Sequence, residues 1–423
     1  MSPPRQPFHL LAKPSGAQCN LDCRYCFYLE KQSLYAERRP RMDARTQERY
    51  IRQLLHAHPA GEVTVAWQGG EPTLLGLDFY ERAMALVERH RRPGQTVTHT
   101  LQTNGLLIDE DWARFLRRHR VLVGLSLDGP QPLHDAYRVT RGGQGSFAAV
   151  RRAWQLLRRH EVEVNLLCCV HAANGDQGLA VYRFFRDELG ARHLQFIPVV
   201  DRLAAQVVAM PGSAAALPPP TPQLAAHSVQ PAQWGRFLIA VFDEWLRSDV
   251  GRVFVQTFDA TLANRLGMPS LCLFSPSCGR ALALEHNGDL YACDHFVDPA
   301  YRLGNIAQQD LAELVASERQ RRFGDAKWRT LPRQCRDCEV LDACFGECPK
   351  NRFLTTPDGE PGLNYLCEGY RAFFRHVEQP MAAMAELLRA GRYADEVMAE
   401  PALQATPLTG RPTQLTPASA PPP

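Results

Sequence analysis

Cysteine is the residue type whose number and spacing in this chain point most directly to chemistry. The 423 residues include 13 cysteines, and eleven of these fall into two groups. The first group has the spacing C-x3-C-x2-C and consists of Cys19, Cys23 and Cys26. The second group consists of Cys272, Cys278, Cys293, Cys335, Cys338, Cys344, Cys348 and Cys367. Soft thiolate ligands in such numbers suit zinc ions or iron–sulfur clusters, so both groups are predicted to bind metal.

The sizes of the two groups help to choose between these metals. Eight cysteines complete two sites of four, whereas three cysteines leave one site short of a ligand. A structural zinc ion takes four protein ligands, and the sequence around Cys19, Cys23 and Cys26 offers no fourth one. An iron–sulfur cluster held by three cysteines is chemically useful, because its remaining iron can bind a small molecule. Zinc stays an alternative for Cys335 and Cys338, whose C-x2-C spacing is also typical of zinc sites.

The two remaining cysteines, Cys168 and Cys169, are adjacent in an apolar segment that is predicted to form a strand. Successive side chains of a strand point to opposite faces, so the two thiols cannot both face one site. Free cysteine behaves as a small apolar residue in protein cores. We therefore expect both residues to pack in the core.

Polar residues that could bind a ligand come at the ends of two predicted strands. They are Gln68-Gly69-Gly70-Glu71-Pro72 and Ser126-Leu127-Asp128-Gly129. Two glycines allow the backbone to approach a ligand closely, although a plain turn at the strand end would also explain them. The nearby Arg138 could pair with a ligand carboxylate through charge-assisted hydrogen bonds, or it could form an ion pair at the surface.

The elements that must position these residues are predicted from the pattern of apolar residues. Six apolar runs are typical of strands buried on both faces, at 8–13, 62–68, 96–103, 121–127, 162–170 and 193–200. Amphipathic helices are predicted between them at 43–57, 77–91, 109–119, 146–160 and 176–189. Three of these helices have candidate N-caps at Asp43, Asp109 and Ser146. The alternation indicates successive right-handed βαβ units, which fit both an open doubly wound sheet and a partial barrel.

The rest of the chain shows other patterns. Residues 201–232 are rich in proline and alanine, which predicts a flexible insertion, and a strong helix is predicted directly after it at 231–248. Within 283–293, Asn287-Gly288 lies between alternating residues and predicts a β-hairpin. The tail after about residue 395 is rich in proline, threonine and alanine, and it is predicted to be disordered.

Composition and charge exclude several classes of function. Hydrophobic residues make up 45% and charged residues 22% of the chain, values typical of a globular protein. The net charge of +3 gives no sign of a nucleic-acid-binding surface. The N-terminus lacks the apolar core of a signal peptide, and no segment approaches the ~18 apolar residues of a membrane span. We therefore expect a cytoplasmic protein that binds neither membrane nor nucleic acid.

The segment Cys19-Asn20-Leu21-Asp22-Cys23-Arg24-Tyr25-Cys26 resembles the cluster loop of radical S-adenosylmethionine (SAM) enzymes. The eight later cysteines resemble those of the SPASM extension, which holds two auxiliary 4Fe–4S clusters. From about residue 8 to 390, the chain resembles the anaerobic sulfatase-maturating enzymes. The resemblance implies an α/β fold, with a partial (β/α)6 TIM-like barrel and a C-terminal cysteine-rich SPASM extension. The implied division is a barrel at 1–250, an auxiliary-cluster domain at 251–380, and a C-terminal helix and tail at 381–423.

The resemblance also implies which residues hold the cofactors, namely three 4Fe–4S clusters and SAM. The first cluster takes Cys19, Cys23 and Cys26 and binds SAM. The ligands of the two auxiliary clusters interleave, so that one cluster takes Cys272, Cys278, Cys293 and Cys348. The other takes Cys335, Cys338, Cys344 and Cys367. The residues implied to contact SAM are Tyr25 through its backbone, Gln68, Gly69, Gly70, Glu71, Ser126, Asp128, Arg138 and, against the adenine, Val200.

The activity implied by the resemblance is the oxidation of a Cys or Ser in a sulfatase polypeptide to Cα-formylglycine (3-oxoalanine). A 5′-deoxyadenosyl radical made from SAM takes a hydrogen atom from the substrate, and the auxiliary clusters accept an electron. Asp294 is implied as the proton acceptor, and Tyr28 is implied to line the substrate cavity. The alternatives are a carboxylate that bonds backbone amides beside the cluster and a tyrosine that packs under the cluster loop.

The partners implied by the resemblance are a sulfatase segment and a redox protein. The segment has the pattern Cys/Ser-x-Pro-x-Arg and must enter in an extended or unfolded form. The electron donor would be a protein such as flavodoxin or ferredoxin, and the enzyme itself is expected to be a monomer.

Two other functions are compatible with the same cysteines. A different SPASM enzyme would crosslink or oxidise a ribosomally made peptide with the same clusters and SAM site, but Asp294 and Tyr28 favour the maturase. Such enzymes more often carry an added N-terminal peptide-binding domain, and the 18 residues before Cys19 leave no room for one. A zinc-stabilised binding protein would contain zinc in place of iron and would not cleave SAM.

Overall fold

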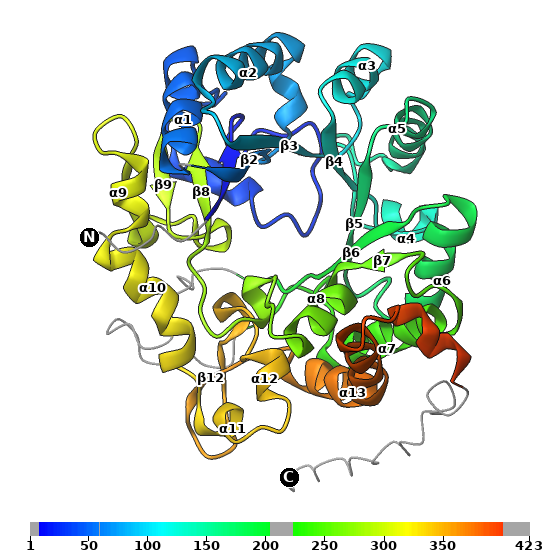
Figure 1. The fold of residues 1–423 in the computed structure, drawn as a ribbon. Helices are drawn as coiled ribbons and strands as arrows, with labels where there is room; N and C mark the ends of the chain where they lie inside the picture. Colours follow the sequence, from blue (N-terminus) through cyan, green and yellow to red (C-terminus); the bar gives the residue numbers. More distant parts are fainter. Residues whose placement is uncertain (1–7, 59, 204–222, 401–423) are drawn as a thin grey trace, which may run out of the picture.

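A curved sheet with helices on its outer side dominates the structure, and together they form an open barrel (Figure 1). The computed structural model describes residues 8–58, 60–203 and 223–400. Within these residues the main sheet has ten strands in the order β10-β9-β8-β1-β2-β3-β4-β5-β6-β7. The arrangement confirms the predicted α/β class.

The first six strands are parallel, as the βαβ pattern predicts. They are β1 (His9–Lys13), β2 (Gly61–Trp67), β3 (Gln95–Thr103), β4 (Val121–Ser126), β5 (Val164–Val170) and β6 (His193–Pro198). The predicted helices are α1 (Ala44–Ala57), α2 (Leu77–His90), α3 (Glu110–Arg118), α5 (Phe147–Arg159) and α6 (Gly178–Arg183). Each strand neighbours the next one along the chain. A doubly wound sheet would instead reverse its strand order at one point, so the partial barrel is the correct alternative.

Two of the three predicted N-caps are confirmed, and the third is wrong. The carboxylate of Asp43 accepts a hydrogen bond from the Thr46 amide at 2.7 Å, and that of Asp109 accepts one from the Trp112 amide at 2.9 Å. Each such cap stabilises its helix by about 1 kcal/mol. Ser146 has a helical backbone in place of an extended one and makes no cap. Its hydroxyl instead donates to the carbonyl of Arg138 at 2.8 Å, which helps to hold the segment of that arginine.

The core between the sheet and the first two helices is built from large aromatic residues. Trp67 at the end of β2 is 2% exposed, and it contacts Tyr50 of α1 and Phe79 and Tyr80 of α2 edge to face. Aromatic pairs prefer this geometry and gain about 0.5–1.5 kcal/mol beyond their buried area. This packing fixes the end of β2, from which the segment of Gly69 and Gly70 continues.

The cysteine-rich part of the chain extends the barrel sheet. Strand β8 (Ala281–Glu285) pairs in parallel with β1 along its whole length, and β9 (Asp289–Tyr291) and β10 (Arg302–Asn305) add antiparallel strands. The hairpin predicted at Asn287-Gly288 joins β8 to β9, and Gly288 has a φ of +87° there. At the other edge, β7 (Phe254–Val255) pairs with β6. The sheet therefore crosses the predicted boundary at residue 250, and the division into domains stays a prediction.

Further helices and a small hairpin complete the structure. Helix α7 (Pro231–Ser248) packs against α13 (Cys367–Arg389), and a Cβ atom at Gly369 would lie only 2.2 Å from the Pro231 carbonyl oxygen. The other helices are α4 (Gln131–Asp135), α8 (Gln256–Arg265), α9 (Leu311–Val315), α10 (Glu318–Arg329), α11 (Arg333–Arg336) and α12 (Leu341–Cys344). A small hairpin joins β11 (Leu354–Thr355) and β12 (Pro361–Leu363). The sequence did not predict α4, because five residues are too few for a periodic pattern.

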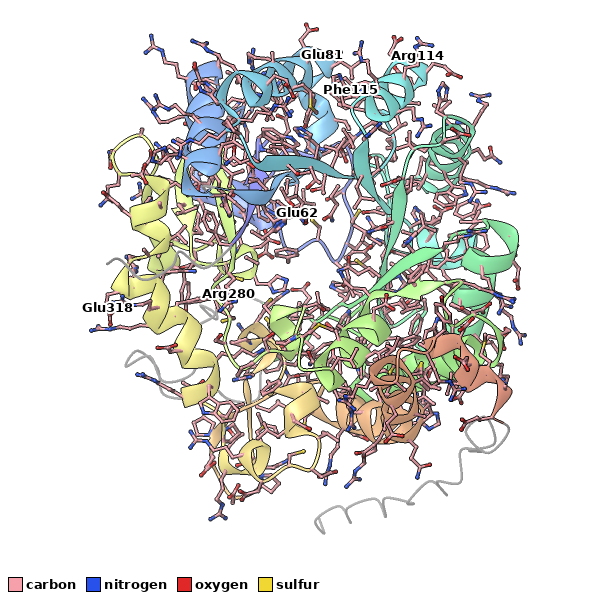
Figure 2. All side chains as sticks on the ribbon, viewed as in Figure 1. Glu62, Glu81, Arg114, Phe115, Arg280 and Glu318 are labelled. Carbon is pink, nitrogen blue, oxygen red and sulfur yellow. The ribbon has the colours of Figure 1, made fainter. Side chains whose placement is uncertain are left out.

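The predicted insertion and tail lie largely outside the described residues, at 204–222 and 401–423. The start of the predicted tail, however, is ordered as a 3-10 helix at Ala394–Ala399. Charged side chains such as Glu81, Arg114 and Glu318 point away from the outer helices (Figure 2). Among the described helices, none combines the length and the apolar character needed to cross a membrane.

Candidate active site and cysteine cages

The loop after β1 gathers the first three cysteines above the barrel strands. The amide of Cys26 donates to the Cys23 carbonyl at 3.0 Å, and the Cys19 sulfur accepts from the Leu21 amide at 3.4 Å. Burial raises the pKa of the Cys19 thiol to about 11 and that of the Cys23 thiol to about 12, and the charges of all three sulfurs interact. A cationic iron centre would stabilise these thiolates, so the group fits a metal cluster that binds three cysteines.

Gly70 lets this loop lie directly against the end of β2. The Gly70 amide donates to the Gly16 carbonyl and the Glu71 amide donates to the Gln18 carbonyl, both at 2.8 Å. A Cβ atom at Gly70 would lie 2.1 Å from the Gln18 carbonyl oxygen, which no real structure tolerates. The predicted close backbone approach is therefore present, but the group that approaches Gly70 is the cluster loop of the chain itself.

The contact at Gly70 leads to a prediction. Gly70→Ala should displace the cluster loop, and we expect at least a tenfold loss of SAM affinity together with reduced iron content. Gly142→Ala is the matched control, because the nearest atom to its added Cβ is 3.8 Å away. Isothermal titration with SAM and iron analysis of anaerobically purified protein would measure both effects. Unchanged SAM affinity in Gly70→Ala would contradict this account of the loop.

Glu71 is fully buried, and its carboxylate is used within the protein. One oxygen accepts hydrogen bonds from the Thr73 amide at 3.0 Å, the Thr73 hydroxyl at 2.6 Å and the Thr103 hydroxyl at 2.8 Å. The other oxygen accepts from the Asn104 amide at 2.8 Å. Burial raises the pKa of Glu71 despite these bonds. A contact of Glu71 with SAM would therefore involve its backbone, while the side chain joins the ends of β2 and β3.

Asp128 organises the end of β4 in a similar way. Its carboxylate accepts hydrogen bonds from the Tyr25 hydroxyl, from Nε of Arg138 at 2.9 Å and from the Cys169 amide at 2.9 Å. Burial alone would raise the pKa of Asp128, but Arg138, His171 and other neighbours hold it below its usual value. The structure thus makes Arg138 a buried partner of Asp128, not a surface ion pair. The Tyr25 side chain is committed to the same carboxylate, which leaves its backbone for other contacts.

Two further predicted SAM contacts lie at or just after strand ends. Of the two cysteines that were predicted to lie in the core, one does so and the other does not. Ser126 ends β4 and Val200 follows β6, and both are 7% exposed. Cys168 is fully buried, as predicted. Cys169 is only partly buried, and its sulfur accepts from Nη2 of Arg138 at 3.7 Å. The core prediction is therefore wrong for Cys169, because alternation along β5 turns it to the face opposite Cys168, where its sulfur contacts Arg138.

The eight later cysteines form two separate groups. We call Cys272, Cys278, Cys293 and Cys348 cage A, and we call Cys335, Cys338, Cys344 and Cys367 cage B. In cage A the sulfur of Cys348 interacts electrostatically with those of Cys272, Cys278 and Cys293. In cage B all four residues line one small cavity. The structure therefore brings together the same interleaved sets that the resemblance implies.

A zinc ion and a 4Fe–4S cluster make different demands on the four sulfurs of a cage. Among the described residues, no three His, Cys, Asp or Glu side chains converge closely enough to hold a single metal ion. A zinc ion needs all four sulfurs at about 2.3 Å from one point. A 4Fe–4S cluster needs more widely spaced sulfurs, because each cysteine binds a different iron. Each cage supplies the four cysteines that such a cluster needs.

Asp294 lies in a 3-10 turn directly after Cys293, and it forms an ion pair with Lys13 at the end of β1. The side chain of Lys13 is 1% exposed and that of Asp294 is 13% exposed. Burial alone would raise the pKa of Asp294, but the charge of Lys13 and weaker contributions from His295 and Lys350 lower it. The carboxylate is thus kept ionised, as a proton acceptor must be.

Tyr28 and Gln68 lie around the same lysine. The ammonium of Lys13 lies 4.6 Å from the centre of the Tyr28 ring and donates to Oε1 of Gln68 at 2.7 Å. The Tyr28 hydroxyl donates to Glu285 at the end of β8, and burial together with this carboxylate raises its pKa well above the usual value. Tyr28 is therefore a hydrogen-bond donor and not a base. The Tyr28 side chain is 3% exposed, which agrees with the alternative that it packs under the cluster loop. Its contact with Lys13 also places it beside Asp294, the partner of that lysine.

Several residues of this site were missed by sequence reasoning. Lys13 and Glu285 pair across β1 and β8, which are separated by more than 260 residues, so only the fold brings them together. Asn104 follows β3, and its side-chain amide donates to Asn20 at 2.7 Å and to the Cys19 sulfur at 3.6 Å. The sequence does contain one sign that Lys13 is unusual, because this lysine ends a strand that is otherwise mostly apolar. A buried lysine side chain needs an anionic partner, and the sequence did not show which one.

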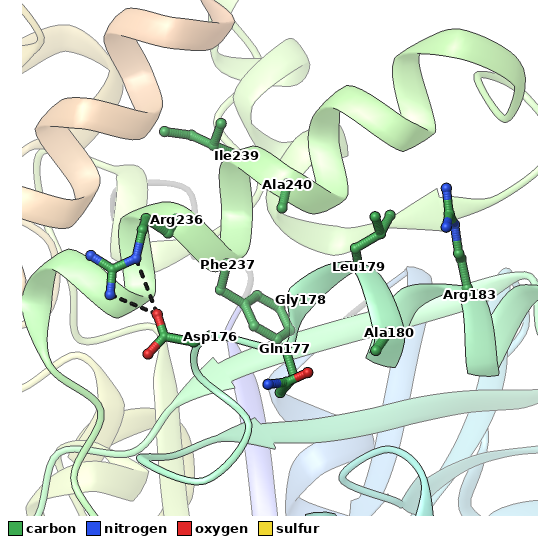
Figure 3. A pocket seen from close by; sticks show the side chains of 10 residues that line it. All are labelled: Asp176, Gln177, Gly178, Leu179, Ala180, Arg183, Arg236, Phe237, Ile239 and Ala240. Carbon is green, nitrogen blue, oxygen red and sulfur yellow. Dashed lines mark hydrogen bonds and ion pairs between the residues drawn. The ribbon is translucent and has the colours of Figure 1, made fainter. Parts of the chain in front are cut away.

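A groove of about 480 Å³ lies on the outer face of the barrel, between α6 and α7 (Figure 3). Leu179 and Ala180 line one side and Phe237 lines the other, while Arg236 donates to Asp176 at 2.6 Å across one end. None of the predicted site residues lines this groove. It is therefore not a part of the candidate active site.

Comparison with known proteins agrees with both parts of the chain. Residues 14–184 match the radical SAM superfamily, and residues 272–339 match an iron–sulfur cluster-binding domain. A serine-type anaerobic sulfatase-maturating enzyme of Bacteroides thetaiotaomicron is 44% identical over 389 residues, which are 92% of this chain and 93% of the relative. A cysteine-type enzyme of Clostridium perfringens is 33% identical, covering 88% of this chain and 96% of the relative.

A solved structure, described as native anSMEcpe with bound AdoMet and Kp18Cys peptide, is similar over most of the molecule. It has a TM-score of 0.78 and 32% identity, and the match covers 90% of this chain and 99% of that one. Identity at this level over nearly the whole length, in addition to the two matched domains, establishes the family. This chain belongs to the anaerobic sulfatase-maturating enzymes of the radical SAM superfamily.

Proposed function

We propose that this protein oxidises a Ser or Cys side chain of a sulfatase polypeptide to Cα-formylglycine. The proposal rests on the family, and the observation that carries it to this chain is the buried Lys13–Asp294 ion pair beside Cys293. It places an ionised carboxylate next to a cage that fits an iron–sulfur cluster. Such a carboxylate is suited to remove a proton from a substrate while an electron leaves.

Three groups of cysteines would hold three 4Fe–4S clusters. Cys19, Cys23 and Cys26 would hold the cluster that binds SAM, and cages A and B would hold the two auxiliary clusters. When bound, these groups supply the radical that removes a hydrogen atom and the acceptor for one further electron. The chain itself contributes the shape of the site and the position of each polar group.

The residues at the strand ends would form the SAM site. Tyr25 belongs to the cluster loop, and Gly69, Gly70 and the Glu71 backbone lie beside it. Ser126 ends β4, while Gln68 and Val200 follow β2 and β6. Arg138 is the cation available for the carboxylate of SAM, and Asp128 is the residue that positions it at 2.9 Å. Ligands of barrels of this kind bind at the carboxyl ends of the strands, where all these residues lie.

Asp294 would accept the proton of the substrate thiol or hydroxyl. The overall change removes one hydrogen atom from the side-chain carbon, one proton from sulfur or oxygen and one electron. Serine then reaches the aldehyde directly, whereas cysteine gives a thioaldehyde that water converts to the aldehyde with release of hydrogen sulfide. Tyr28 would line the cavity, with its hydroxyl fixed by Glu285.

Replacing Lys13 tests how much the site depends on its buried cation. Lys13→Gln leaves the Asp294 carboxylate buried without its partner, which typically costs about 3–5 kcal/mol. We expect a lower midpoint of thermal unfolding and at least a tenfold loss of aldehyde formation. Arg89→Gln is the control, because its ion pair with Glu48 is 3.7 Å long and exposed, and such pairs contribute at most about 1 kcal/mol. A Lys13→Gln variant as stable and active as the parent would contradict this role.

The partners follow from the same proposal. The substrate would be an unfolded sulfatase segment with the pattern Cys/Ser-x-Pro-x-Arg, and a flavodoxin or ferredoxin would supply electrons. We propose a monomer that works in the cytoplasm. The higher identity to the serine-type relative, 44% against 33% for the cysteine-type one, favours serine as the substrate residue.

The experiment that tests the proposal compares two matched peptides that differ only in Ser or Cys at the target position. Anaerobically reconstituted protein is incubated with reductant, SAM and each peptide, and the peptides are examined by mass spectrometry. We expect an aldehyde at the target residue, formed faster from the serine peptide. SAM cleavage that leaves both peptides unchanged would favour the alternative, an enzyme that modifies another ribosomally made peptide.

A further inference from the structure

Two buried cations, Lys327 and Arg352, lie between cage A and cage B. Lys327 is on α10 and is fully buried, and Arg352 follows a 3-10 turn that begins after Cys348 and is 4% exposed. Lysine and arginine are almost never fully buried unless they are paired with an anion. We therefore expect negative charge close to both residues.

Lys327 is held against the backbone of cage A. Its ammonium donates to the carbonyls of Cys272 and, at 2.7 Å, Leu273. Its charge also acts on the sulfurs of Cys272, Cys278 and Cys348 and on the Glu347 carboxylate. The lysine thus points its charge at one side of cage A.

Arg352 is held in the same way beside cage B. Its guanidinium donates to the carbonyls of Gly346 at 2.7 Å and Lys327 at 2.6 Å, with further bonds to Phe345 and Glu347. Its charge acts on the sulfurs of Cys335 and Cys344, and it also acts on Cys278 and Cys348 of cage A. Four hydrogen bonds to backbone carbonyls hold the guanidinium beside the cage.

No carboxylate in the described part of the chain forms an ion pair with either cation. The nearest buried carboxylate is Glu347, which is 2% exposed and accepts hydrogen bonds from Asn364 at 2.7 Å and Asn351 at 3.2 Å. Two positive charges therefore face one carboxylate and eight cysteines. Burying unpaired charge is costly, so the missing negative charge has to come from what the cages bind.

A 4Fe–4S cluster held by four thiolates is a net anion, and its reduction adds one negative charge. A nearby buried cation stabilises the reduced form more than the oxidised form, and the low dielectric of the interior strengthens this effect. Net charge, hydrogen bonding and burial are the factors that set cluster potentials. Lys327 is held against cage A, whereas Arg352 is held beside cage B and also acts on cage A.

We propose that Lys327 raises the reduction potential of the cluster in cage A and that Arg352 raises that of the cluster in cage B. This inference rests on the proposed function, because it requires a cluster in each cage. The two cations make the clusters better acceptors for the electron that leaves the substrate. Both are positioning residues, because each acts on a cluster through its charge and neither side chain has to touch the substrate.

The test is a redox titration of the anaerobic holoenzyme, followed by electron paramagnetic resonance. Lys327→Gln keeps one side-chain donor but removes the charge, and we expect the cage A potential to fall. The expected shift is at least tenfold in the reduction equilibrium, or about 59 mV for one electron. The cage B potential should change less, which gives an internal control. Arg329→Gln, on the same helix but 76% exposed, should change neither potential.

Arg352 provides a second, independent variant pair. Arg352→Gln should lower the cage B potential by a similar factor, and Arg352→Lys should restore it because the charge is kept. Unchanged potentials in both glutamine variants with normal iron content would overturn the proposal. Loss of iron from both variants would also overturn it, in favour of a purely structural role. Wild-type protein that lacks iron for one cage would instead contradict the cluster assignment in the proposed function.

Discussion

Asp294→Asn is expected to stop aldehyde formation while the protein continues to cleave SAM. The amide has nearly the same shape as the carboxylate but cannot accept the substrate proton. General-base catalysis typically contributes about 10²–10⁴-fold to the rate, so aldehyde formation should fall by at least about 100-fold. Within the described residues, no hydrogen bond or ion pair joins Asp294 directly to a residue proposed to contact SAM, and for this reason 5′-deoxyadenosine should still form.

Asp325→Asn is the matched control for this variant. Asp325 lies on α10, is 54% exposed and forms only a long pair with Arg329 at 3.7 Å. Chromatography would measure 5′-deoxyadenosine, and mass spectrometry would measure the aldehyde in the same sample. Normal aldehyde formation by Asp294→Asn would show that another group removes the proton. Loss of both products would indicate that Asp294 holds the site together and is not its base.

Cys23→Ala is expected to abolish SAM cleavage altogether. The cluster loop offers three sulfurs, and removing one leaves two ligands for a group that needs three. The Cys23 thiol is also close to Arg138 and Asp128, so its loss removes the link between the cluster and the SAM site. Cages A and B lie elsewhere in the chain and should keep their iron. We expect the iron content and the visible absorbance to fall only in part.

Cys168→Ala is the control for Cys23→Ala, because Cys168 is fully buried in β5. It removes one thiol from the core and should leave SAM cleavage close to that of the parent. Formation of 5′-deoxyadenosine by Cys23→Ala at the parental rate would contradict the assignment of the first cluster. A loss of all iron in Cys23→Ala would show that the three sites do not fold independently.

The barrel could be predicted from the sequence because its strands and helices are regular. Apolar runs located six parallel strands to within about three residues, and the carboxylates of Asp43 and Asp109 marked two helix starts. Ser146 misled the same reasoning, because its hydroxyl is used by a backbone carbonyl across a turn. The sequence also could not show that β8 pairs with β1, since parallel pairing over such a distance leaves no local pattern.

The chemistry of the site was predictable only where the spacing of residues was informative. The cysteine groups could be recognised, since metal ligands follow fixed spacings. Glu71 and Asp128 were recognised as residues of the site, but the role of their side chains was not predicted. Both carboxylates accept hydrogen bonds from other residues of the chain. Lys13 was missed, because its partner Asp294 is brought to it only by the folded chain. These contacts between distant residues decide which polar groups are free for a ligand.

The most direct test of the central claim uses a peptide with deuterium on the side-chain carbon of its target Ser or Cys. Wild-type protein is incubated with this peptide, SAM and reductant, and the deuterium is followed into 5′-deoxyadenosine. The account predicts labelled 5′-deoxyadenosine and one aldehyde for each label transferred. Unlabelled 5′-deoxyadenosine, with deuterium retained in an unchanged peptide, would contradict it.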